Sequence, residues 1–449
     1  MLDLSNNKWT KYLFYSSLSG LSAICYYFFA YKVSRIDFFE IVVLYSVLFV
    51  LFFRIYSTQK NNFLVLASTA LFFRAIFIVA TPTLSQDFYR FIWDGRILLQ
   101  GINPYLFTPE SFIEKSIFPI AQAEELHKEM GQLSANNYTN YPPINQLCFA
   151  IANLFSSRNI LGSIIFMRLQ LILADIGILY FGKKLLEKLN LPVSTLFLYM
   201  LNPFIIIELT GNLHYENVML FFLIWSIYLL HTNKWKWAAV VFALSISVKL
   251  IPLLFLPLFF QQFKFKKLIV FYFIVLATTA LLFVPFFNQS FIHNYAQTIG
   301  LWFQKFEFNA SIYYIVRAIG FQLSGYNQIT IIGKIIPIFI LLIVLSITFF
   351  RKNDSTKEIL IAMLLSLTCY FFLSTTVHPW YIATLVLLSV FTPYRYTLVW
   401  SWAVILSYSA YRTTIFNENS WLITLEYLLI YSWVIWEVFF KIKRQNQHA

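Results

Sequence analysis

The segment Ile335–Phe350 reads IIPIFILLIVLSITFF and carries no charged residue. Two further runs, Val193–Ile207 and Val218–Leu230, are also free of charge. A helix that crosses a bilayer needs about 20 mostly apolar residues, whereas the strands of a membrane β-barrel alternate apolar with polar positions. Continuous runs of this kind therefore predict membrane-spanning α-helices.

The composition of the whole chain agrees with these runs. Of 449 residues, 59% are hydrophobic and only 12% are charged, while soluble domains carry about 25% charged residues. The cysteines Cys25, Cys148 and Cys369 lie far apart in apolar stretches, without the spacing of a disulfide framework or a metal site. The net charge of +13 is scattered in short clusters, so we expect no nucleic-acid partner. A soluble enzyme and a secreted disulfide scaffold are excluded.

Hydropathy predicts an all-α transmembrane bundle of about twelve spans, near 12–32, 36–54, 63–80, 160–182, 193–210, 215–231, 268–287, 328–350, 358–375, 381–393, 396–411 and 421–440. Two apolar segments do not fit this series. Ile144–Phe155 is too short to cross and indicates a re-entrant or interfacial half-helix. Ala238–Phe260 is interrupted by Lys249 and Pro252, so we expect two half-helices that fold back as a hairpin.

The basic residues predict the orientation of the chain. Short clusters of Lys and Arg fall on one side of the predicted spans, which places both ends in the cytoplasm. Two long segments, 81–143 and 288–328, then face outward and contain enough aromatic residues to pack. No internal repeat is visible. We expect one integral membrane domain over residues 1–449 with an outward-facing site.

The most informative segment is Ser85–Arg96, SQDFYRFIWDGR, at the start of the first outward segment. On a helix, Asp87 and Asp94 would share one face about 10 Å apart along the axis, with Arg90 in ion-pair range of both. A carboxylate at the mouth of a membrane cavity can accept a proton from a sugar hydroxyl. A solvated, ion-paired helix explains the same spacing equally well.

The order of several motifs resembles polyprenyl-phosphate-dependent mannosyltransferases of the GT-C superfamily. It is similar to the bacterial branch and to the catalytic subunit of GPI mannosyltransferase I. The matching residues are Arg74, Ser85–Arg96, Gly101–Tyr105, Tyr141–Pro143, Gly211–Glu216, Lys249–Pro252 and His378–Tyr381. The resemblance implies transfer of a hexose, with mannose expected, from a polyprenyl-phosphate donor to a glycolipid or glycan acceptor. The transfer would invert the anomeric carbon at the outer face of a bacterial inner membrane.

The resemblance also implies roles for individual residues. Asp87 matches the second acid of an Asp-x-Asp motif and is the candidate general base, and Asp94 matches a later acid of the same segment. Ser85 stands where the eukaryotic pattern has its first Asp, which puts a metal-bridging role in doubt. We therefore assign no metal ligand and leave a divalent metal open. The remaining polar residues of the motif are candidates for substrate binding: Tyr89, Arg90 and Arg96.

Ionisable residues within apolar runs supply further candidates, since such residues are costly at membrane depth. Arg74 and Lys249 are candidate ligands of the donor phosphate. Alternatively, Arg74 pairs with another helix and Lys249 stabilises the hairpin. His214 and Glu216 could bind acceptor hydroxyls or cap an interface.

His378 lies at another outer junction, where aromatic residues such as Trp380 also occur in membrane interface belts. A second function remains open, namely transport or flipping of lipid-linked sugars. A transporter favours repeated halves and charges deep in the bundle. In this chain the informative charges are expected at one face, which favours the transferase.

Overall fold

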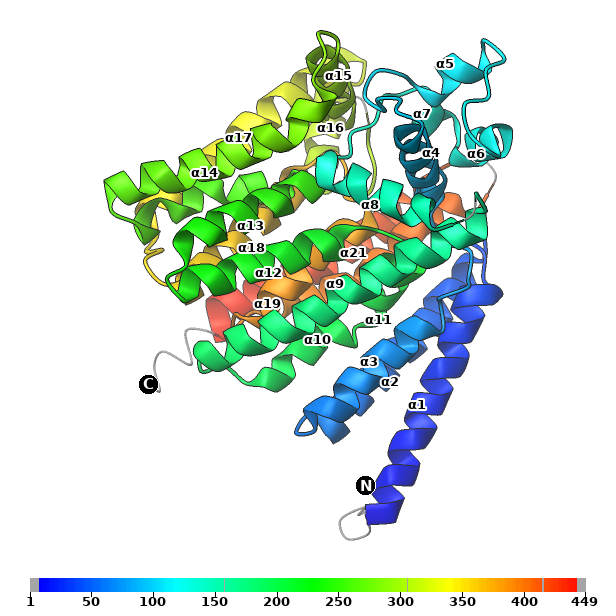
Figure 1. Cartoon of the computed structure of the whole chain (residues 1–449). Coiled ribbons are helices and arrows are strands. Elements are labelled where there is room, and N and C mark those ends of the chain that lie inside the picture. The colour runs from blue at the N-terminus through cyan, green and yellow to red at the C-terminus, as the bar shows by residue number, and fades with distance from the viewer. Residues whose placement is uncertain (1–7, 157, 305, 414–415, 442–449) are drawn as a thin grey trace.

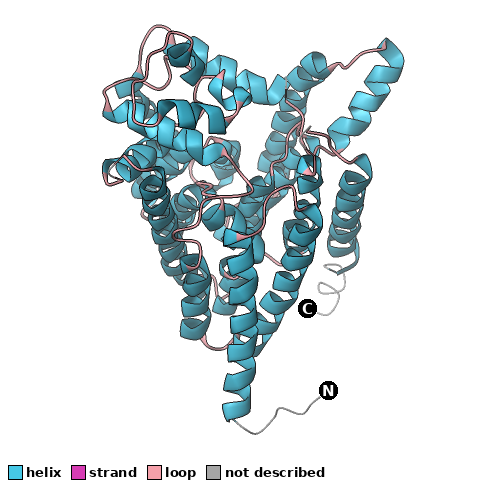
Figure 2. Ribbon diagram, turned by 90° about the vertical axis from the view of Figure 1, so that its right-hand side faces the viewer, coloured by secondary structure: helices cyan, strands magenta, loops and turns pink. Residues whose placement is uncertain are grey.

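The computed structural model describes residues 8–156, 158–304, 306–413 and 416–441. Within these ranges the chain forms helices and no β-strand, and one isolated bridge joins Phe308 to Thr376. Figure 1 and Figure 2 show the long helices running side by side, with most short helices and loops gathered at the end opposite the N-terminus. The predicted all-α membrane bundle is confirmed.

Seven helices are long and apolar enough to cross a bilayer. They are α1 (Lys8–Tyr31), α2 (Phe38–Gln59), α9 (Ile160–Lys188), α14 (Phe265–Phe283), α17 (Ile329–Phe350), α18 (Thr356–Leu373) and α21 (Ser420–Ile435). An eighth crossing is possible if the bent pair Val193–Met200 and Pro203–Gly211 forms one span. The pair is bent by 50° at Asn202, where Pro203 cannot continue the backbone hydrogen bonds of the preceding helix.

The remaining predicted spans are shorter or broken helices. These elements are α3 (Phe63–Ala75), α12 (Glu216–His231), η5 (Pro379–Ile382), α19 (Ala383–Val390), α20 (Tyr396–Ala403) and η6 (Val404–Tyr411). The bent pair consists of η1 (Val193–Leu196), α10 (Phe197–Met200), α11 (Pro203–Ile205) and the π-helix η2 (Ile206–Gly211). Hydropathy counts apolar residues whether or not they are helical, so the figure of twelve spans stays a prediction.

The segment around Lys249 is the expected hairpin. Helix α13 (Trp235–Val248) ends at Lys249, whose backbone is extended, and the 3₁₀-helix η3 (Ile251–Gln262) returns along it. The rings of Phe242 and Phe259 lie 5.2 Å apart, and those of Trp235 and Phe263 lie 6.1 Å apart. The two arms therefore lie side by side, and Lys249 is at the tip between them.

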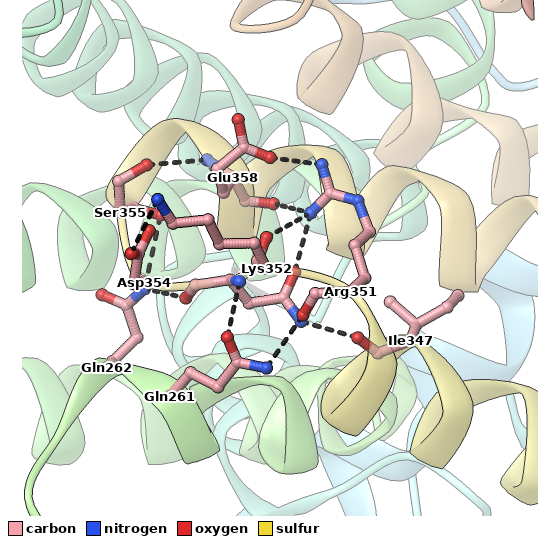
Figure 3. Close-up of polar contacts among 9 residues, drawn as sticks. Gln261, Gln262, Ile347, Arg351, Lys352, Asp354, Ser355 and Glu358 are labelled. Atoms are coloured by element: carbon pink, nitrogen blue, oxygen red, sulfur yellow. Dashed lines mark hydrogen bonds and ion pairs between the residues drawn. The ribbon is translucent and has the colours of Figure 1, made fainter.

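A polar network holds the far end of η3 (Figure 3). Gln261 Nε2 donates to the carbonyls of Thr348 and Arg351 at 2.7 and 2.8 Å, and its Oε1 accepts from Asn353 N at 2.8 Å. Arg351 pairs with Glu358 at the start of α18. The Gln261 side chain thus satisfies backbone groups that are left over where α17 ends, and η3 is fixed to the α17–α18 turn.

The segment 81–143 folds into α4 (Asp87–Leu99), α5 (Pro109–Ile113), α6 (Ala123–Met130) and α7 (Gln132–Ala135), and leads into α8 (Pro143–Leu154). Helix α8 is the expected short helix, and it packs against α4 and α9. A Cβ at Gly95 of α4 would lie 2.5 Å from the carbonyl oxygen of Phe149 in α8, so this glycine allows the close approach of the two helices.

The 3₁₀-helix η4 (Val284–Phe286) leads into the segment 288–328, which contains α15 (Phe291–Gln304) and α16 (Ile312–Ser324). This region is bonded to the segment 81–143. Asn294 Nδ2 donates to the carbonyl of Tyr105 at 3.0 Å, and Asn103 Nδ2 donates to that of Phe286 at 2.9 Å. Within the segment 81–143, Tyr105 OH donates to the carbonyl of Tyr141 at 2.6 Å. The two segments therefore form one cap over the bundle. The last described element is the π-helix η7 (Trp436–Lys441).

Buried charges fix the unwound parts of the bundle. Arg168 of α9 donates to the carbonyls of Ile78 and Ala80 after α3, at 2.9 and 2.8 Å. The same guanidinium donates to the carbonyls of Thr210 and Gly211 at the end of η2, at 2.9 and 2.8 Å. One side chain replaces the hydrogen bonds that these four carbonyls lose where the helices end.

Candidate active site

A cavity of about 340 Å³ lies beneath the cap. Its walls come from the start of α4, the segment before α8, the tip of the α13–η3 hairpin, α17, the segment before α19 and the end of η6. The polar and aromatic residues that line it include Arg35, Asp87, Arg90, Tyr141, Lys249, His378, Trp380, Tyr381, Tyr408 and Tyr411. Sequence positions that are hundreds of residues apart therefore meet around one space.

Asp87 is half-buried in the cavity wall. As the first residue of α4 it has no intrahelical partner for its backbone N–H, which donates to Ser85 Oγ at 3.3 Å. Burial raises the pKa of the Asp87 carboxyl to about 6, while the charge of Lys249 lowers this pKa and that of Glu216 raises it. The carboxylate is thus ionised at neutral pH but close to its titration point, as suits a general base.

Lys249 reaches the same cavity from the tip of the hairpin. It forms an ion pair with Glu216, the first residue of α12, whose side chain is completely buried, whereas that of Lys249 is 15% exposed. A buried charge is costly unless an opposite charge pairs with it, and Glu216 supplies that charge. A cation is therefore held in the wall of the cavity that Asp87 also lines.

Arg90 and Asp94 form a pair within α4. Arg90 lines the cavity, and its Nε donates to Asp94 Oδ1 at 2.7 Å, while Nη1 donates to the carbonyls of Ser134 and Asn137 at 2.5 and 2.9 Å. Asp94 is fully buried behind the wall and also accepts from Gln146 Nε2 at 3.1 Å. The geometry places Asp94 as a support for Arg90, which in turn fixes the segment before α8.

Three other candidates lie outside the cavity. Arg74 is completely buried, donates from Nε to Asp175 Oδ2 of α9 at 2.6 Å and from Nη1 to the carbonyl of Met200 at 2.7 Å. Arg96 donates to the carbonyl of Ala121 at 2.7 Å. Tyr89 is half-buried and its ring lies 4.0 Å from that of Phe88. The structure does not bring these three side chains to Asp87.

The histidines belong to a stack of rings. The ring centroids of His214 and Trp380 are 3.7 Å apart, and those of Trp380 and His378 are 4.6 Å apart with nearly parallel planes. Phe308 continues the stack, 5.0 Å from His378. His378 and Trp380 line the cavity, whereas His214 lies behind Trp380 and 3.9 Å from Glu208. The stack fixes one aromatic wall of the cavity.

The sequence of this region matches a known protein family. The model of the family described as alpha-(1→6)-mannopyranosyltransferase, N-terminal domain, covers residues 31–263, which is more than half of the chain. The chain belongs to this mannopyranosyltransferase family. The match includes Asp87, Glu216 and Lys249, so three of the charges described above lie within the part that the family shares. The resemblance expected from the motifs is confirmed at the level of the family.

One relative within the mannopyranosyltransferase family is alpha-(1→6)-mannopyranosyltransferase A of Mycobacterium tuberculosis. The two chains are 20% identical over 167 residues, which cover 37% of this chain and 30% of the relative. The matched stretch therefore spans less than a third of the relative's length.

Several cavity residues of this family member were not among the sequence candidates. Arg35 lies in the short link between α1 and α2, and its guanidinium is 5.2 Å from the centre of the Tyr411 ring. Tyr408 OH donates to Glu208 Oε1 at 2.7 Å. Arg35 could have been proposed from the sequence, because it is a charged residue at a predicted outer junction. No local pattern distinguishes Tyr408 and Tyr411 from other tyrosines at a membrane interface.

Across the described ranges of this mannopyranosyltransferase family member, no three His, Cys, Asp or Glu side chains come close enough together to hold a metal ion. The acids and imidazoles near the cavity instead contact cations or aromatic rings, as Glu216 and His378 show.

Proposed function

We propose that the chain is a membrane glycosyltransferase that moves a hexose, with mannose expected, from a polyprenyl-phosphate donor to a lipid- or glycan-linked acceptor. Transfer takes place at the outer face and inverts the anomeric carbon. The observation that carries this proposal is the half-buried Asp87 carboxylate beside the Lys249–Glu216 pair in one cavity. Membership of the mannopyranosyltransferase family supports the choice of sugar.

Asp87 acts as the general base. Its carboxylate takes the proton of the acceptor hydroxyl while the hydroxyl oxygen forms a bond to the anomeric carbon of the donor. The bond between that carbon and the phosphate oxygen breaks on the opposite side, and its electron pair leaves with the polyprenyl phosphate. A carboxyl with a pKa of about 6 is ionised before the reaction and can hold the proton for long enough to release it to solvent.

Lys249 stabilises the leaving phosphate. Negative charge grows on the phosphate oxygen as the glycosidic bond breaks, and a cation already fixed in a water-poor site stabilises this charge without reorganising. The ion pair with Glu216 limits where the ammonium group of Lys249 can move. Arg74 has no part in this site, because its completely buried side chain pairs with Asp175 and does not line the cavity.

Apolar residues beside Lys249 suit a lipid-linked donor. Leu250 and Ile251 follow it in sequence, and Ile336 and Ile340 of α17 line the same cavity. Helix α17 is very apolar, and most of its side chains face away from the protein. The polyprenyl chain would lie along this wall with its phosphate at Lys249.

The decisive experiment uses purified protein and polyprenyl-phosphate mannose labelled in the sugar. Transfer releases unlabelled polyprenyl phosphate and moves the label to an acceptor from a membrane extract. A transporter or flippase moves the donor across a vesicle membrane and leaves it intact, and that outcome would replace the proposed reaction.

The outward orientation is tested by labelling with an impermeant thiol reagent. Lys115 and Lys352 are both exposed and lie in the cap and at the α17–α18 turn, respectively. In a variant without the three native cysteines, Lys115→Cys is expected to react in intact cells and Lys352→Cys only after permeabilisation. The reverse pattern would place the site on the cytoplasmic side.

A further inference from the structure

Among the described residues that line the cavity, Arg35 is a cation with no acidic partner. Of the basic residues that line it, Arg90 pairs with Asp94 and Lys249 pairs with Glu216. Within the described residues, no carboxylate oxygen lies within 4.0 Å of a nitrogen of the Arg35 guanidinium. An arginine that is half-buried in a cavity without a counter-ion is available to bind an anion.

The α1–α2 link holds Arg35 in place. Ser34 N donates to Asp37 Oδ2 at 2.9 Å, which closes a tight turn around Arg35 and occupies the neighbouring carboxylate. The guanidinium lies over the Tyr411 ring at 5.2 Å, a contact that favours a cation. The turn fixes the backbone at Arg35, and the ring contact positions a guanidinium that lines the cavity.

The two cations reach the cavity from different elements. Lys249 lies at the tip of the α13–η3 hairpin, whereas Arg35 lies in the α1–α2 link against Tyr411 at the end of η6. The apolar wall formed by Ile251, Ile336 and Ile340 is continuous with the Lys249 end, whereas the Arg35 end lies at the link between two helices.

We infer that Arg35 binds an anionic group of the acceptor, a phosphodiester or a carboxylate, at the wall of the cavity formed by the α1–α2 link. This inference rests on the proposed function, which assigns Lys249 to the donor phosphate. The base has to lie beside the acceptor hydroxyl, and the donor phosphate leaves from the far side of the anomeric carbon, so a second cation on another wall of the cavity is assigned to the acceptor. The acceptor is then a negatively charged glycolipid or glycan.

The test measures binding and needs no turnover. The probe is an octyl glycolipid in which mannose is joined through a glycerol phosphodiester, and its reference is the uncharged methyl phosphotriester. Dissociation constants are measured by titration calorimetry with the full-length protein in one detergent. The wild type is expected to prefer the phosphodiester by about tenfold or more, since 1.4 kcal/mol corresponds to tenfold. Glycerol phosphate as a competitor separates a lipid-linked phosphate from a free one.

Arg35→Gln is expected to remove this preference, and Arg35→Lys to retain part of it and to show that the protein still folds. The matched control is Arg412→Gln, because Arg412 is exposed beside Tyr411, lies over the Phe38 ring and does not line the cavity. The control keeps the full preference.

Equal binding of the two probes by the wild type would overturn the inference, as would a preference that survives Arg35→Gln. Weakened binding of polyprenyl phosphate by Arg35→Gln would assign Arg35 to the donor instead. The absence of sugar transfer in any assay contradicts the proposed function and leaves these binding constants unaffected, so the two failures are distinguishable.

Discussion

Two ion pairs between helices look alike in sequence and differ in structure. Arg74–Asp175 joins α3 to α9, and Lys249–Glu216 joins the hairpin tip to α12. Both members of the first pair are completely buried, and Arg74 also donates to two backbone carbonyls. In the second pair Lys249 borders the cavity next to Asp87. A buried cation is available to a substrate only where its partners leave some of its donors exposed to a cavity.

The largest effect on activity is expected from Asp87→Asn, in the cavity that Lys249 borders. Asparagine keeps the shape of the side chain but cannot accept a proton, so turnover is expected to fall by roughly 10²–10⁴-fold with unchanged donor binding. The measurement is the rate of sugar transfer at saturating donor. Asp354→Asn, in the exposed α17–α18 turn, is the control and should retain full activity. Near-normal turnover in Asp87→Asn would remove Asp87 as the base.

The completely buried pair Arg74–Asp175 is expected to affect the stability of the fold. Arg74→Met leaves Asp175 buried and unpaired, and breaking such a pair costs about 3–5 kcal/mol of unfolding free energy. The double variant Arg74→Met/Asp175→Leu should recover much of this loss, because an apolar pair of similar volume avoids the buried charge. Thermal unfolding in detergent measures both effects. A raised donor KM in the folded Arg74→Met protein would instead return Arg74 to the donor site.

The Lys249–Glu216 pair, which borders the cavity, should respond differently when its charges are removed. Lys249→Met is expected to lower kcat by about 10²–10³-fold, the usual loss when one preorganised group that stabilises a transition-state charge is removed. Lys249→Arg should retain part of the rate. The double variant Lys249→Met/Glu216→Gln should not recover activity, in contrast to the recovery of stability expected for Arg74→Met/Asp175→Leu. Lys266→Met, an exposed lysine at the start of α14, serves as the control. Recovery in the double variant would show that the pair only stabilises the fold.

The pH dependence gives the smallest and most specific effect. Because the base must be ionised, kcat/KM should be constant above the pKa of Asp87, which is about 6, and fall tenfold per pH unit below it. Glu216→Gln removes a negative charge that raises the pKa of Asp87, so the pH at which kcat/KM begins to fall should move to a lower value. The pH profiles of kcat/KM for wild type and variant are measured in one buffer series. Identical profiles would exclude electrostatic coupling between Asp87 and Glu216.

The sequence predicted features that depend on local order. Lys249 and Pro252 interrupt an apolar run, and this alone was sufficient to predict the hairpin. Asp87 follows a predicted span directly, so its position near the end of the bundle could be inferred. The charge and spacing of Arg74 could not show its partner, because Asp175 is 101 positions away and only packing of α3 on α9 brings them together. The aromatic residues of the cavity required the tertiary structure for the same reason.

Arg168 has a consequence for the order in which the chain enters the membrane. If α3 entered the bilayer before residue 168 had been synthesised, the carbonyls of Ile78 and Ala80 would lose their water without gaining a hydrogen bond, and each unsatisfied carbonyl costs several kcal/mol in a lipid environment. The end of α3 is therefore not stable in the bilayer by itself. It has to remain at the water interface or in the insertion machinery until α9 arrives, so α3 and α9 enter the lipid as a unit. A nascent chain that stops before residue 168 should leave the end of α3 accessible to water-soluble reagents.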